Sequence, residues 1–173
     1  MSGWGKYVWA SLAIAMVTHL AIINAVPSVL TGVAISRLGE AGVNQWHVAS
    51  RVTAQSRTIV RPAPDFAYSA CSYDLGDGPL TLRVAQWPDY WSLSLYAANS
   101  DNYFVIDDRE VRGDAEIVLV RAGRTAPDGA ERVVESPSRR GVALIRRLAP
   151  TATAYSAAAQ VARGDVCARF AES

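Results

Sequence analysis

Lysine, histidine and cysteine are scarce in this chain of 173 residues, which holds one lysine against sixteen arginines, two histidines and two cysteines. The net charge of +1 argues against nucleic acid as a main partner, because phosphate backbones are bound by a clustered basic excess. His47 is the only histidine after the first 36 residues. A histidine-based metal site or a Ser-His-Asp triad there lacks its central residue, so the sequence predicts no metal and no cofactor.

Sequence motifs of the common enzyme classes are also missing. The chain has no G-x-S-x-G turn, no phosphate-binding P-loop, no dinucleotide fingerprint and no C-x-x-C pair. Asp74 and Asp77 stand in a glycine-rich segment, but the D-x-D-x-D-G spacing of a calcium loop is absent, and a turn is favoured. The sequence therefore predicts no catalytic residue and favours a protein that is not an enzyme.

Charge is missing altogether from residues 7–36, a run of 30 residues without Asp, Glu, Lys or Arg. A helix needs roughly 20 apolar residues to cross a membrane, so this segment is predicted to be a transmembrane anchor, kinked at Pro27. The alternative is a cleaved signal peptide with residues 34–36 as its small-x-small site, but the apolar run exceeds the usual length. Lys6 on the N-terminal side weakly favours an exported C-terminal part.

Polar and small residues inside this segment predict a contact with a second membrane helix. A polar side chain is unfavourable in lipid unless it has a partner, and small residues at helical spacing let two backbones approach closely. The alternative is that alanine is simply common here and that the histidine binds water or a backbone carbonyl. The predicted helix interface consists of His19, Asn24, Ala21, Ala25, Ser28 and Gly32.

The rest of the chain predicts a linker followed by a β domain. Residues 37–60 have no sustained apolar stripe and are interpreted as a polar connecting helix or linker, and two prolines at 62 and 64 mark the start of a domain over 61–173. A helix is expected over 151–163, before Gly164. Seven short runs with turn residues between them indicate a β-sandwich or jelly roll. These predicted strands are residues 66–73, 80–85, 91–96, 103–106, 116–121, 132–135 and 142–148.

The two cysteines, Cys71 and Cys167, can close almost the whole domain with one disulfide if the domain is exported. Closing so long a loop stabilises a protein by about 3–5 kcal/mol. The alternative is that Cys71 is a small buried apolar residue. Export favours the disulfide slightly.

Candidate binding residues gather where a strand rich in aromatic residues runs into a polar turn at 99–102. Such a strand, expected to have one buried and one wet face, can line a binding mouth, although a self-satisfied turn explains the polar residues equally. Four arginines at 139, 140, 146 and 147 can bind a carboxylate or phosphate, or form a solvated face. The predicted ligand or partner surface comprises Tyr68, Tyr90, Trp91, Asn99, Asp101, Asn102 and Arg146.

The segments 65–79, 90–96 and 101–104, with the later Ser-Pro at 136–137 and Arg146, together resemble the family called domain of unknown function 1254. The resemblance covers residues 61–148 and implies a β-sandwich or jelly-roll domain with no established catalytic residue. Short members of the family resemble this chain throughout, including an apolar N-terminal helix. Longer members carry a second domain, so the resemblance implies a separate partner protein with domain of unknown function 1214.

These observations favour a single-pass protein of the bacterial inner membrane with a periplasmic β domain. Its expected role is that of a binding or scaffold component in an envelope complex, with the membrane and a protein as partners. The alternative is a small-ligand hydrolase or lyase that uses Asp65 or Asp101 with Tyr68. A polar pocket that encloses all three side chains would favour the enzyme.

Overall fold

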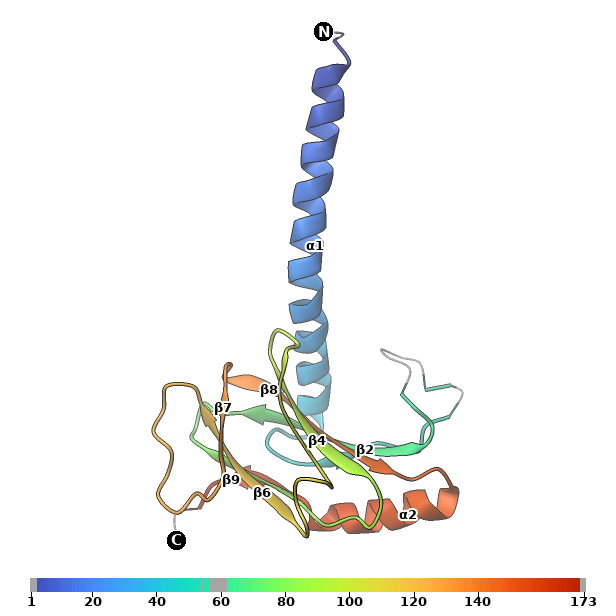
Figure 1. The fold of residues 1–173 in the computed structure, drawn as a ribbon, viewed down its shortest axis with the longest axis vertical. Helices are drawn as coiled ribbons and strands as arrows, with labels where there is room; N and C mark the ends of the chain where they lie inside the picture. Colours follow the sequence, from blue (N-terminus) through green and yellow to red (C-terminus); the bar gives the residue numbers. More distant parts are fainter. Residues whose placement is uncertain (1–2, 54, 57–61, 172–173) are drawn as a thin grey trace.

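A computed structural model describes residues 3–53, 55–56 and 62–171, and it consists of one long helix and a two-sheet domain (Figure 1). Helix α1, Gly5–Glu40, stands on the domain, and helix α2, Ala152–Val161, lies along the opposite side. Pro27 lies inside α1 without ending it. The chain is therefore mainly β with an N-terminal and a C-terminal helix, as the sequence predicts.

Helix α1 has two parts that differ in their surroundings. From Gly5 to Val26 every described side chain is exposed, and these 22 residues extend for about 33 Å. From Pro27 onward one face is half-buried against the domain, where α1 contacts strands β2, Phe66–Asp74, and β8, Arg140–Leu148. The helix is long and apolar enough to cross a membrane, and its free part matches the ~30 Å hydrocarbon core of a bilayer.

The connecting helix expected over 37–60 is not observed, although residues 54 and 57–60 lie outside the described part. Helix α1 continues to Glu40 and then stops, because Gly42 and Asn44 adopt positive φ angles of 138° and 58°. The chain next forms the short strand β1, His47–Val48, which pairs with the edge of β2. Without an apolar stripe to bury, this segment gains more from pairing its backbone with a sheet edge.

The domain is a sandwich of a five-stranded and a four-stranded sheet. The first has the order β1-β2-β8-β4-β5, with β4 at Trp91–Ala97 and β5 at Asn102–Asp107, and all its pairs are antiparallel. The second has the order β7-β6-β3-β9 and contains one parallel pair, β6 with β7. Its strands are β3 at Leu80–Val84, β6 at Ala115–Arg121, β7 at Val133–Ser136 and β9 at Val166–Arg169.

The core between the sheets consists of alternate residues of each strand. Tyr73 is fully buried there, and its phenol hydroxyl hydrogen-bonds the hydroxyls of Tyr103 and Ser136 at 2.9 Å each. Gly141 lies beside it, because a Cβ at this position would be 2.2 Å from the Tyr73 oxygen. The large apolar residues around this cluster include Leu80, Leu82, Trp91, Leu93, Leu95, Ile106, Ile117, Leu119 and Ile145.

Strand β4 departs from the predicted pattern of one buried and one wet face. Ser92 and Ser94, on the face that points away from the core, are both 0% exposed. Each serine lies between larger cross-strand neighbours, Ser94 between Leu144 and Val105 for example. A serine side chain is too short to reach past such neighbours to the solvent. The polar residues of β4 therefore alternate with apolar ones without forming a solvent-exposed face.

Candidate partner-binding site

The predicted binding residues lie in three separate places. Tyr68, Tyr90 and Arg146 come together on the outer face of the five-stranded sheet, at the end where β8 finishes. Trp91 points into the core and is 1% exposed, because it shares its strand face with Leu93 and other core residues. The polar residues at 99–102 lie in the β4–β5 turn, at the opposite end of the sheet.

Three aromatic rings and one guanidinium form the outer-face group, here called the aromatic–arginine cluster: Phe66, Tyr68, Tyr90 and Arg146. The ring centroid of Phe66 lies 6.0 Å from that of Tyr90 and 6.4 Å from that of Tyr68, both at tilted or edge-on angles. Tyr68 stands directly opposite Arg146 across β2 and β8. Sequence reasoning missed Phe66, although its position two residues before Tyr68 on one strand places both on the same face.

Polar atoms without a partner lie beside this cluster. Among the described residues, Nε of Arg146 and the hydroxyls of Ser92 and Ser94 are buried and have no hydrogen-bond partner. Ser92 is the cross-strand neighbour of Arg146, so these atoms belong to one patch of the sheet face. Aromatic residues and arginine are enriched in the centres of protein interfaces, where they carry most of the binding energy. The patch has the composition of such a centre.

The β4–β5 turn is closed on itself. The side-chain amide of Asn99 donates to the Asp101 carboxylate at 2.7 Å, and the Asp101 amide donates back to the Asn99 side-chain oxygen at 3.2 Å. Asn102 begins β5 and pairs with Tyr96. These contacts are those of a local Asx-type turn, which is the second interpretation given above.

The three residues of the alternative enzyme site do not share a pocket. Asp65 directly precedes β2, whereas Asp101 lies beyond the other end of β4, a separation of about 26 Å along the length of β8. The phenol oxygen of Tyr68 accepts a hydrogen bond from the Ala63 amide at 3.0 Å. Asp101 is therefore too far from Asp65 and Tyr68 to act together with them.

Three of the four arginines considered as anion ligands bind carboxylates of this chain. Asp74 accepts from Nε of Arg139 at 2.7 Å and from Nε of Arg140 at 2.8 Å. Burial raises the pKa of Asp74, but these two hydrogen bonds and one from the Gly76 amide outweigh it and lower the pKa to about 2. Arg147 is buried rather than solvated, and it binds Asp165.

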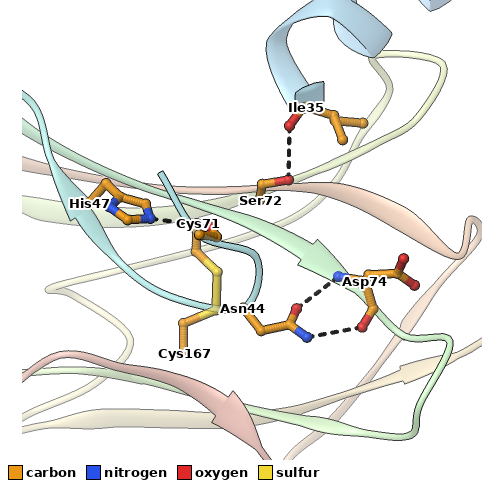
Figure 2. The surroundings of a disulfide bond; sticks show 8 residues. Ile35, Asn44, His47, Cys71, Ser72, Asp74 and Cys167 are labelled. Carbon is orange, nitrogen blue, oxygen red and sulfur yellow. Dashed lines mark hydrogen bonds between the residues drawn. A yellow bond between two sulfur atoms is a disulfide. The ribbon is translucent and has the colours of Figure 1, made fainter. Parts of the chain in front are cut away.

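The junction between α1 and the domain is fastened by several polar contacts, which Figure 2 shows around the disulfide of Cys71 and Cys167. The hydroxyl of Ser72 donates to the backbone carbonyl of Ile35 in α1 at 3.2 Å. Asn44 binds the backbone of Asp74 on both sides, donating at 3.2 Å and accepting at 2.8 Å. These bonds hold the end of α1 against β2.

The predicted membrane-helix interface is divided by this junction. Ser28 and Gly32 line a cavity of about 580 Å³ between α1 and the domain, with Tyr73 and Arg140 on its other side. Asn24 donates its side-chain amide to the Leu20 carbonyl one turn earlier at 2.8 Å. The remaining members, His19, Ala21 and Ala25, are exposed on the free part of the helix.

Metal ligation has no support in the residues that the structure describes, which contain no group of three or more His, Cys, Asp or Glu side chains able to hold an ion. His47 instead makes a ring-nitrogen contact with the Gly42 carbonyl at 3.2 Å. That contact ties β1 to the turn after α1. It gives the histidine a local structural role.

Solved structures of other proteins are similar to this chain, and the first of the two described here shows a shared fold. The VPA0106 protein from Vibrio parahaemolyticus matches 83% of this chain with a TM-score of 0.57 and 13% identity. A putative uncharacterized protein from Burkholderia cenocepacia matches 65% of the chain with a TM-score of 0.48 and 20% identity. The matches cover 37% and 33% of those two chains, so this chain spans about a third of their length.

Curated proteins gave no match to the chain. A family model described as "Protein of unknown function (DUF1254)" matches residues 43–168. The match begins just before β1 and ends within β9, and it therefore includes both sheets and the disulfide. It starts after the end of α1 at Glu40. The chain belongs to the DUF1254 family of proteins of unknown function.

Proposed function

We propose that this protein is a single-pass component of the bacterial inner membrane whose periplasmic β domain binds a protein partner within an envelope complex. The aromatic–arginine cluster is the observation that carries the proposal. It presents three rings and a guanidinium on a sheet face, next to buried polar atoms that have no partner in the described part of the chain. A second protein that covers this face would bury the half-exposed rings and the guanidinium of Arg146.

The contacts of α1 favour an uncleaved anchor over a signal peptide. The small-x-small site at residues 34–36 lies in a continuous helix, and the Ile35 carbonyl within it accepts the hydrogen bond from Ser72. Cleavage there would remove most of the part of α1 that packs on β2 and β8. The helix thus serves both as a membrane anchor and as a structural element of the domain.

The disulfide supports export of the domain to the periplasm. Cys71 and Cys167 are both nearly inaccessible, at 0% and 6% exposure, and they join the two sheets. Disulfides of this structural kind form and persist in oxidising compartments such as the bacterial periplasm, and they are rare in the cytosol. An N-terminus inside the cell and a β domain outside it agree with the charge pattern around α1.

The partner that we propose is a separate protein with domain of unknown function 1214. The solved relatives are about three times as long as the part that this chain matches, so they carry additional chain within one molecule. A second polypeptide that supplies an equivalent of this additional chain would bind the β domain described here. His19, Asn24, Ala21 and Ala25, which are exposed on α1, form a second contact with this partner inside the membrane.

The proposal is tested by purifying the full chain from detergent-solubilised membranes and identifying what accompanies it by mass spectrometry. A stoichiometric partner that is lost with Arg146→Glu, but retained with Arg109→Glu, is the expected result. Arg109 is an exposed arginine in the turn after β5 and serves as the matched control. A monomer that carries no partner in either the unaltered chain or the control would contradict the proposal.

A further inference from the structure

A second concave site lies at the end of the sandwich nearest to α1, away from the aromatic–arginine cluster. It is a cavity of about 650 Å³ between the turn that follows β2 and the loop that follows β6. We call it the arginine cavity, and its lining consists of residues 75–79, 120–121 and 123–125 together with Arg139.

Positive charge dominates this lining. Arg121 comes from the end of β6, Arg124 from the loop after it, and Arg139 from the turn between β7 and β8. Asp77 is the one carboxylate among the lining residues, and its oxygen already binds the guanidinium of Arg169. The described lining therefore has an excess of guanidinium groups over the carboxylates available to them.

The arginine cavity is partly preorganised by its backbone. Asp74 holds Arg139 through two hydrogen bonds, of 2.7 and 3.3 Å. Gly76 lets this guanidinium approach, because a Cβ at Gly76 would lie 2.3 Å from a terminal nitrogen of Arg139. Gly123 has a φ angle of 78° and turns the loop so that Arg121 and Arg124 line the same cavity. Little side-chain entropy remains to be lost when Arg139 binds an anion.

The position of the arginine cavity connects it to the membrane surface. Asp74, which holds Arg139, also lines the cavity between α1 and the domain. Contacts with the domain begin at Pro27, where the free part of α1 ends. If α1 crosses the membrane as proposed above, this end of the sandwich faces the lipid headgroups.

We propose that the arginine cavity binds a phosphate group, either in an anionic phospholipid headgroup or in a soluble phosphate compound. Guanidinium groups present planar pairs of N–H donors that match two phosphate oxygens, and they keep their charge at every physiological pH. The lipid form of the ligand rests on the proposed membrane anchoring, whereas the chemistry of the cavity does not. Nothing in this site requires the protein partner.

Hydrogen–deuterium exchange on the full chain tests this proposal. One arm adds inorganic phosphate to the protein in a neutral detergent. The other compares nanodiscs of phosphatidylcholine with nanodiscs that also contain phosphatidylglycerol. Slower exchange of residues 75–79 and 121–125 is expected in at least one arm. Protection by phosphate identifies a soluble ligand, and protection by phosphatidylglycerol alone identifies a headgroup.

Charge removal completes the test. Arg121→Gln and Arg124→Gln, both at exposed positions, are each expected to lower the affinity for the ligand that gives protection about tenfold. Arg109→Gln is expected to leave this affinity unchanged. Absence of protection in both arms, or protection that survives the combined Arg121→Gln and Arg124→Gln substitution, would overturn the proposal. Because the phosphate arm needs neither a bilayer nor a partner, its result is independent of the proposed function.

Discussion

Arg147 and Asp165 form a two-pronged ion pair inside the sandwich, with nitrogen–oxygen distances of 2.6 and 2.9 Å. Their side chains are 2% and 0% exposed. Arg147 also donates to the Ala85 carbonyl at 3.1 Å, and Asp165 accepts from the Ala85 amide at 2.9 Å. The pair therefore joins β8, the segment after β3 and the residue before β9.

Removal of one partner of this buried pair should be strongly destabilising. Asp165→Asn leaves the Arg147 charge buried without its counter-charge, and such changes cost about 3–5 kcal/mol of unfolding free energy. Chemical denaturation of the full chain in detergent measures the loss. The control is Asp77→Asn, because the Asp77 pair with Arg169 is largely exposed and should leave the midpoint almost unchanged. Equal effects of the two substitutions would contradict this account of the pair.

The disulfide should stabilise the domain chiefly by restricting the unfolded chain. Cys71 and Cys167 are separated by 96 positions, and closing a loop of that size corresponds to about 3–5 kcal/mol. The free energies of unfolding of the oxidised and the reduced chain, measured with one spectroscopic probe, should therefore differ by this amount. Two reactive thiols in the protein purified without reductant would show instead that the bond does not form in the cell.

Stability should fall at acidic pH because of Asp74. Its pKa is lowered from 3.8 to about 2 by hydrogen bonds from Arg139, Arg140 and Gly76 that exceed the effect of burial. The folded state thus holds the proton less tightly than the unfolded state, so this contribution is complete above the ordinary pKa and is lost as pH falls through 2. Unfolding midpoints measured across this range should decline for the unaltered chain and decline less for Asp74→Asn. Parallel curves would rule out the role of Asp74.

Gly141 should tolerate no side chain. A Cβ there would lie 2.2 Å from the Tyr73 hydroxyl and 2.2 Å from the Tyr96 carbonyl. Gly141→Ala must therefore shift either a buried phenol or the backbone of β4. We expect this shift to lower the free energy of unfolding by about 2–4 kcal/mol. Thermal unfolding measures it. Gly32→Ala, with no atom within 4 Å of the added Cβ, is the control and should change the midpoint little.

Most of the fold was predictable from sequence, because short strands between turn residues show a clear alternation of residue types along the chain. All seven predicted strands form. The two that were missed, β1 and β9, have only two and four residues, too few to show alternation. The prediction of a connecting helix was wrong because backbone pairing with β2 decides the structure of that segment, and no local sequence pattern reveals this pairing.

The candidate site was predictable only in part. Tyr68, Tyr90 and Arg146 are far apart in sequence and meet through the register of β2, β8 and β4, which composition does not determine. Arg146 and Arg147 are neighbours on one strand and must point to opposite faces, so one of them had to face inward. Its partner Asp165 follows α2, and only the packing of the two sheets brings that carboxylate to it.

Site-specific photo-crosslinking in the intact cell determines whether the aromatic–arginine cluster lies against a protein partner. A photo-reactive benzoylphenylalanine is placed at Tyr68 in the aromatic–arginine cluster, and the control is placed at Glu116, which is exposed on the outer face of the four-stranded sheet. We expect one specific cross-link from position 68 to a protein exposed to the periplasm and none from position 116. Equal labelling from both positions, or no protein cross-link from position 68, would contradict this expectation.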